Sequence, residues 1–110
     1  MPAWTFIASA HAAVNAGLIP YFVDVDAETW ALDPEALAEQ LARAPAPVGA
    51  VMPVAPFGRP IDTAAWDAFR MSTKVPMVID AAAGFDIEFE AREFVPRDFM
   101  GLGSFYLSGN

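Results

Sequence analysis

The sequence contains no cysteine, one histidine (His11) and one lysine (Lys74) among its 110 residues. Without cysteine, the chain forms neither disulfides nor thiolate metal sites. A single histidine is too few for an ordinary zinc or iron site, and we expect His11 to be packed and hydrogen-bonded within a helix. The arginines are scattered and the net charge is −8, so the chain offers no basic surface to a nucleic acid.

Long hydrophobic runs are also missing. No segment reaches the roughly 18 consecutive apolar residues that a membrane-spanning helix needs. The N-terminus shows no charged segment followed by an apolar core and a cleavage site, as a secretory signal would. We therefore expect a cytoplasmic protein that does not enter a membrane.

What the sequence does have is an excess of apolar residues over charged ones. The hydrophobic share is 55% and the charged share 18%, against a usual hydrophobic share of about 45–50%. This balance favours a piece of a larger protein, or a subunit with a large interface. An alanine-rich monomer is the alternative, because alanine raises the hydrophobic count while adding little apolar surface.

Helix and strand signals alternate along the first 80 residues. Helices are predicted at 6–17, 32–44 and 62–74, and strands at 18–26, 48–54 and 75–80. Asp33 precedes a proline at the first helical position, Asp62 opens the last helix, and Gly17 follows the end of the first. Trp66, Phe69 and Met71 are predicted to share one side of the last helix.

Strands that read as continuous apolar runs, separated by helices of this length, predict an α/β fold. They indicate a parallel sheet with flanking helices on both faces. From Ile87 onward the alternation stops and the sequence supports no assignment of elements.

Acidic residues stand where the predicted strands end. Asp80 closes the last strand, and ligands of open parallel sheets bind beyond the carboxyl ends of the strands. Small residues follow it at 81–84, which would let a backbone or ligand approach closely. Alternatively, Asp80 caps the following turn, and position alone leaves both interpretations open. Asp24 and Asp26 are expected to anchor a loop, since no third metal ligand accompanies them.

Four motifs follow one another along the chain. They are residues 2–37 with "PAWTF" and "VDVDAETWALDP", residues 51–62 "VMPVAPFGRPID", residues 75–86 "VPMVIDAAAGFD" and residues 104–110 "SFYLSGN". In this order they resemble the DegT/DnrJ/StrS-type sugar aminotransferases. These enzymes depend on pyridoxal 5'-phosphate (PLP) and belong to the fold-type I, aspartate aminotransferase superfamily. The resemblance implies that residues 1–110 are a central fragment of a PLP-binding large domain, with 1–86 well matched and 87–110 poorly matched.

The resemblance also implies roles for individual residues. Asp80 would pair with the pyridine nitrogen of PLP, Phe6 would stack on the cofactor ring, and Ser104 would bind the cofactor phosphate. A carboxylate beside the ring nitrogen keeps it protonated and makes the ring a better electron sink. Ala83 stands where the family usually has Gln or His. The "FGRPID" loop is taken as architectural.

One departure from the family pattern concerns the chemistry itself. Gly109 stands where the family has the Schiff-base lysine, and Lys74 lies at the opposite end of the strand that carries Asp80. Without an amine at the cofactor the chain alone should not transaminate. The intact parent would be a cytoplasmic homodimer that passes an amino group, from glutamate, to a keto sugar on a nucleotide carrier.

Two other functions are considered beside this one. The first alternative is a non-catalytic, lysine-less relative that serves as a binding or assembly module. Gly109 favours this alternative, because it removes the Schiff-base lysine. An unrelated nucleotide-binding α/β domain is disfavoured, because no glycine-rich phosphate loop follows any predicted strand.

Overall fold

The computed structural model describes residues 1–82. Its helices are α1 (Ile7–Asn15), α2 (Pro34–Leu41) and α3 (Thr63–Thr73), with a short 3-10 turn, η1 (Pro56–Gly58), between α2 and α3. Each of the three predicted helices is therefore present, and each is shorter at both ends than the range its sequence signals suggested.

The starts of α2 and α3 are capped as predicted. The Asp33 carboxylate accepts a hydrogen bond from the backbone N–H of Glu35 at 3.0 Å, with Pro34 opening the helix. The Asp62 carboxylate accepts one from the N–H of Ala65, also at 3.0 Å. Each bond satisfies one of the backbone donors that the first turn of a helix leaves without an internal partner.

The end of α1 depends on Gly17. Its φ of +77° is a left-handed conformation that glycine adopts without steric cost. The N–H of Gly17 donates to the carbonyl of Val14 at 2.9 Å, and the N–H of Leu18 donates to that of Ala13 at 3.0 Å. This pair of bonds is the Schellman motif, which stops a helix and turns the chain away.

Two of the three predicted strands, 48–54 and 75–80, pair with each other in parallel, although only through isolated bridges, and the third, 18–26, pairs instead with Pro2. Pro2 pairs with Val23, Val51 with Met77, and Val54 with Asp80. No regular strand forms in residues 1–82, so the parallel sheet expected from the sequence is represented by these pairings and not by a continuous ladder.

Proline accounts for the interruption between the last two segments. Val78 donates to the carbonyl of Val51, and Asp80 donates to that of Pro53, as a parallel ladder requires. The next bond in the series would need an N–H at residue 53, which proline lacks. One missing donor thus splits the pairing of 51–54 with 77–80 into two bridges, and Pro76 likewise prevents its extension below Val51.

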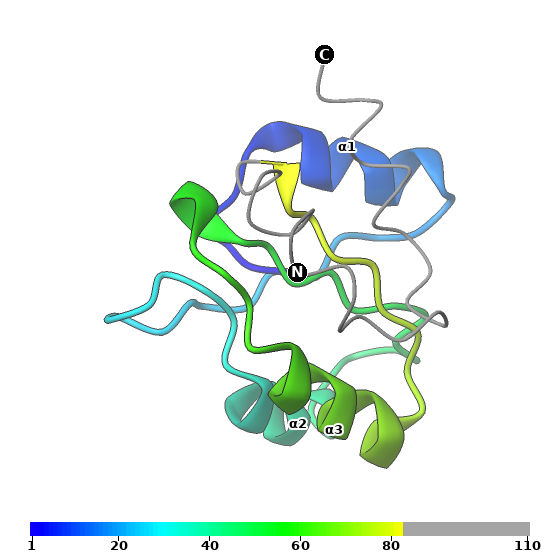
Figure 1. Ribbon diagram of the computed structural model, residues 1–110. Coiled ribbons are helices and arrows are strands. Elements are labelled where there is room, and N and C mark those ends of the chain that lie inside the picture. The colour runs from blue at the N-terminus through cyan, green and yellow to red at the C-terminus, as the bar shows by residue number, and fades with distance from the viewer. Residues whose placement is uncertain (83–110) are drawn as a thin grey trace.

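The helices lie on both sides of the paired segments. Figure 1 shows α1 on one side of them and α2 with α3 on the other. The helices α2 and α3 also contact each other. This arrangement agrees with the predicted covering of both faces.

The apolar core lies on the side of α2 and α3. Alternate residues of the paired segments are buried there together with Leu37 of α2, and Trp66 meets Phe69 edge-to-face at 5.3 Å. The core consists of Val23, Leu32, Leu37, Val51, Ala55, Trp66, Phe69, Met77, Ile79 and Ala81. The prediction for Met71 is wrong, because its side chain is 57% exposed.

No helix within residues 1–82 combines the length and the apolar character that crossing a membrane requires.

Two aspartates of the α3 region provide a matched test of this account. We expect Asp62→Ala to lower the free energy of unfolding by about 1 kcal/mol, because it removes the N-cap. Asp67→Ala removes only the half-exposed ion pair with Arg70 and should cost less than about 0.5 kcal/mol. Urea unfolding followed by circular dichroism measures both. Equal losses would contradict the capping role of Asp62.

Candidate functional site

Asp80 has its backbone fixed by both neighbouring hydrogen bonds of the paired segment. Its N–H donates to the carbonyl of Pro53 and its carbonyl accepts from the N–H of Ala55, each at 2.9 Å. Side chains alternate between the two faces of an extended segment. Since Ile79 and Ala81 point into the apolar core, Asp80 is on the opposite face, toward α1. This explains why a buried strand can end in a carboxylate.

The Asp80 side chain is held under α1. It is 7% exposed, and its Oδ2 accepts a hydrogen bond from the hydroxyl of Ser9 at 2.8 Å. Ser9 is fully buried and also contacts the hydroxyl of Thr5, with 2.7 Å between the two oxygens. Oδ1 accepts a longer bond, 3.3 Å, from the N–H of Ala82. The turn-capping interpretation of Asp80 is therefore correct in part, but the shorter bond runs to the helix.

Phe6 is placed on the same helix start. It is the N-cap residue of α1, three positions before Ser9, and its side chain is 78% exposed. Most of Phe6 is therefore accessible to a partner. Both candidate residues that the structure describes are therefore linked to the first turn of α1: Phe6 is its N-cap, and Asp80 is bonded to its Ser9.

The other residues discussed from the sequence are either outside the described residues or distant from Asp80 along the chain. Ser104, Gly109 and Ala83 lie outside the described residues. Lys74 is exposed and left-handed at the end of α3, with φ of 59°. The extended segment 75–80 leads from it to Asp80, a span of roughly 20 Å at ~3.3 Å per residue. This separation agrees with the expectation that Lys74 lies at the far end of the strand.

The chemistry of Asp80 fits a cationic ring nitrogen. A buried carboxylate is usually paired with a cation or fully hydrogen-bonded. Among residues 1–82, no basic side chain forms an ion pair with Asp80. Two donors from this described part of the chain reach its oxygens, whereas an ionised carboxylate has about four acceptor positions. The side chain therefore has acceptor capacity for a protonated nitrogen such as that of PLP.

Ser9 and Thr5 were not identified by the sequence analysis. The available signal was the spacing of two hydroxyl residues at i and i+4, which places them on the same side of a helix. The expectation for His11 was wrong, because that residue is exposed on α1.

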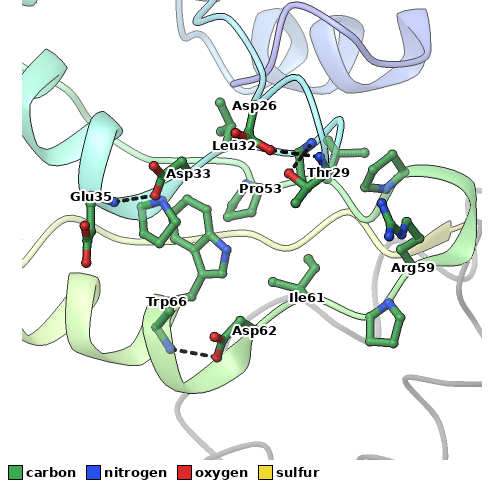
Figure 2. A pocket seen from close by; sticks show the side chains of 16 residues that line it. Asp26, Thr29, Leu32, Asp33, Glu35, Pro53, Arg59, Ile61, Asp62 and Trp66 are labelled. Atoms are coloured by element: carbon green, nitrogen blue, oxygen red, sulfur yellow. Dashed lines mark hydrogen bonds between the residues drawn. The ribbon is translucent and has the colours of Figure 1, made fainter.

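A separate pocket of about 650 Å³ opens between the 26–35 loop and the loop before α3 (Figure 2). Neither Asp80 nor Phe6 lines it. Three of the four acids that line it bond to the chain's own backbone: Asp33 and Asp62 cap helices, and Asp26 accepts from the N–H groups of Glu28 and Thr29 at 3.0 and 2.8 Å. The fourth acid is Glu35. These engagements make the pocket a structural junction, so the Asp80 region is the better candidate site.

Loop anchoring by Asp26 confirms the sequence-based interpretation of that residue. The side chain of Arg59 adds a bond from the "FGRPID" loop to the carbonyl of Glu28, at 3.3 Å. No group of three or more residues that could hold a metal ion occurs within residues 1–82.

Comparison with known proteins finds a PLP-dependent aminotransferase among the solved structures that resemble this chain. A crystal structure from Bacillus cereus, assigned as a PLP-dependent aminotransferase, superimposes with a TM-score of 0.70 at 31% identity, covering 94% of this chain and 26% of that one. The 3-amino-5-hydroxybenzoate synthase of Amycolatopsis mediterranei is 35% identical over 105 residues, 96% of this chain and 26% of that protein.

A third similar protein is named for a nucleotide-sugar substrate. The UDP-2-acetamido-2-deoxy-3-oxo-D-glucuronate aminotransferase of Pseudomonas aeruginosa is 29% identical over 107 residues, 97% of this chain and 29% of that protein. The DegT/DnrJ/EryC1/StrS aminotransferase family matches residues 1–108. The chain belongs to this family, and it spans between a quarter and three-tenths of the length of the two curated relatives.

The anchored loop generates a prediction about pH. Hydrogen bonds from the N–H and hydroxyl of Thr29, and then from the N–H of Glu28, lower the pKa of Asp26. A lowered folded-state pKa contributes stability above the unfolded value, and this contribution is lost as pH falls through the folded value. Asp26→Asn keeps an acceptor oxygen but does not titrate.

We therefore expect wild type to be more stable than the Asp26→Asn variant at neutral pH, with the difference shrinking below about pH 4. Thermal unfolding of both proteins at several pH values measures this difference. A gap that stays constant down to pH 2 would contradict the role given to the charge.

Proposed function

We propose that this chain is a central part of the PLP-binding large domain of an aminotransferase, and that it supplies Asp80 and Phe6 to the cofactor site. The observation that carries the proposal is the buried Asp80 carboxylate, which has no ion-pair partner among residues 1–82 and sits where a parallel-paired segment ends. We further propose that in the complete protein the separate parallel pairings belong to one sheet.

Each residue has a defined task in this proposal. Asp80 accepts a hydrogen bond from the cofactor's ring nitrogen and balances its positive charge. Phe6 covers one face of the ring, and Ser104 binds the phosphate. PLP, when bound, supplies an electron sink that stabilises the negative charge left when the α-proton of an amino acid departs.

Turnover by this chain alone is not expected. Gly109 occupies the position of the family's lysine, and Lys74 starts the segment whose other end carries Asp80. The proton-shuttling amine must therefore come from outside these residues, or the chain acts as a non-catalytic binding or assembly module. The second function is favoured by Gly109 alone.

The substrate of the parent enzyme is proposed to be a keto sugar on a nucleotide carrier, with an amino acid as the amino donor. The name of the Pseudomonas aeruginosa relative supports a nucleotide sugar. The name of the Amycolatopsis mediterranei relative contains no sugar, so an aromatic amine product is the second candidate.

Self-association is a further part of the proposal. Large apolar side chains are exposed at Phe6, Ile7, Ile19 and Phe22, with exposures from 52% to 93%. Exposed apolar side chains are typical of interfaces where they gather in one patch. We propose a homo-oligomer located in the cytoplasm, with no nucleic acid or membrane as partner.

PLP binding tests the proposal directly. Titration followed by absorbance should show saturable binding to wild type, weakened about tenfold or more by Asp80→Asn, because the variant loses a hydrogen bond between charged groups. Asp67→Asn, at a partly exposed acid of α3 that pairs with Arg70, is the matched control and should bind as wild type does. Equal affinities in all three proteins would contradict the role of Asp80.

The same mixtures test whether an amine of this chain reaches the cofactor. After borohydride reduction and peptide mapping, we expect no stoichiometric adduct. The amines to inspect are Lys74 and the Met1 amino group, whose pKa is lowered by burial. A one-to-one adduct on either amine that disappears in Asp80→Asn would contradict the argument from Gly109.

Sedimentation tests the proposed association. At micromolar concentration, the chain should sediment as a species larger than an 11.8 kDa monomer. A monomer at every concentration would contradict the homo-oligomer.

A further inference from the structure

We infer that Ser9, supported by Thr5, is the positioning residue that holds the Asp80 carboxylate ready for the cofactor's ring nitrogen. This inference rests on the proposed function, because it assigns a purpose to Asp80 only if Asp80 meets the cofactor. It adds two residues that act through Asp80 and do not themselves need to touch the cofactor.

The direction of both hydrogen bonds follows from the number of protons available. A serine hydroxyl has one proton to donate, and an ionised carboxylate only accepts. Ser9 Oγ lies 2.8 Å from Asp80 Oδ2, so the Ser9 proton is committed to the carboxylate. The 2.7 Å contact between Thr5 Oγ1 and Ser9 Oγ must then be donated by Thr5. The chain of bonds runs from Thr5 to Ser9 to Asp80.

This direction suits the ionised form of Asp80. Each hydroxyl turns its positive end toward the acid, and hydrogen bonds in a chain polarise and strengthen one another. Ser9 is also in the first turn of α1, where the backbone dipoles favour a negative charge. Protonation of Oδ2 would reverse the donor at that oxygen and break the sequence of donors.

The chain of hydrogen bonds from Thr5 through Ser9 to Asp80, called the relay below, also determines which carboxylate oxygen can accept a further hydrogen bond. Oδ2 is engaged by the short, buried bond from Ser9, whereas Oδ1 accepts, among residues 1–82, only the 3.3 Å bond from the N–H of Ala82. Oδ1 is therefore the oxygen with more room for another donor. Because the Ser9 bond restrains the carboxylate as a plane, it fixes Oδ1 as well.

The same helix turn carries the proposed stacking residue. Phe6 lies between Thr5 and Ser9 in the sequence and is exposed, while Ser9 is fully buried. The first turn of α1 thus directs an aromatic ring outward and a hydroxyl inward to Asp80. We infer that the Ser9–Asp80 bond sets the distance between the ring-stacking and nitrogen-binding residues.

A measurement without cofactor tests the relay itself. The ¹³Cγ signal of Asp80 in the labelled full chain reports on donors at the carboxylate. We expect Ser9→Ala to displace this signal strongly and Thr5→Val to displace it less in the same direction, because Ser9 remains. Ser72→Ala, which removes a helical hydroxyl bonded to the carbonyl of Phe69, should leave it unchanged.

A signal that does not move in Ser9→Ala would overturn the relay. Should the Ser9→Ala chain fail to fold, Thr5→Val decides, since it keeps Ser9 and removes only the outer donor. An unmoved Asp80 signal in that variant would overturn the direction assigned to the two bonds, and a displaced one would support it.

PLP titration of the same proteins tests the positioning role. We expect Ser9→Ala to weaken PLP binding about tenfold, as loss of a donor to a charged group does, with Thr5→Val in between and Ser72→Ala like wild type. Unchanged affinity in Ser9→Ala, with a displaced Asp80 signal, would overturn the positioning role alone. Absence of PLP binding by wild type would overturn the proposed function, while the carboxyl signal still judges the relay.

Discussion

The structure depends on one buried hydrogen bond between residues that are 71 positions apart, the bond from the Ser9 hydroxyl to the Asp80 carboxylate. Of the nine residues of α1, only Ser9 is buried, so this helix has little apolar contact to hold it in place. Leaving a buried carboxylate without its donor costs roughly 1–3 kcal/mol or more. The same bond thus attaches α1 to the paired segments and satisfies the acid that the paired segments place beneath it.

The two sides of the paired segments differ in chemistry: one is apolar and the other carries a buried acid. The side toward α2 and α3 is apolar and holds the core, including Trp66 and Phe69. The side toward α1 carries Asp80 and the hydroxyls that engage it. Strand alternation makes this division possible, because adjacent residues such as Ile79 and Asp80 face opposite ways. Half of a cofactor site is proposed here: a residue for the ring nitrogen and one for the ring face, without the lysine.

Local signals in the sequence were sufficient to predict the helices. Asp33, Asp62 and Gly17 act within one turn of the chain, and each does in the structure what its residue type predicts. The interruption of the sheet was not predictable in the same way, since the missing N–H of Pro53 matters only once the register with Val78 is known. Apolar run lengths carry no such information.

The candidate site was predictable in part for a similar reason. Asp80 and Phe6 could be proposed from motifs, whereas Ser9 gains its role from a contact across the fold. A serine in an alanine-rich helix has no distinguishing local signal. The left-handed φ of Lys74, 59°, could not be predicted from its residue type either. His11 was predicted to be packed, and Met71 to share one side of its helix with Trp66 and Phe69. Both residues are exposed, because the helical position of a residue alone does not say what covers it.

A crystal structure of this chain soaked with PLP tests the central claim most directly. The account predicts the ring nitrogen within about 3.2 Å of the Asp80 carboxylate, the ring against Phe6, and the Ser9 hydroxyl still bonded to Oδ2. Ordered PLP bound with its nitrogen away from Asp80, or with Asp80 turned from Ser9, would contradict it.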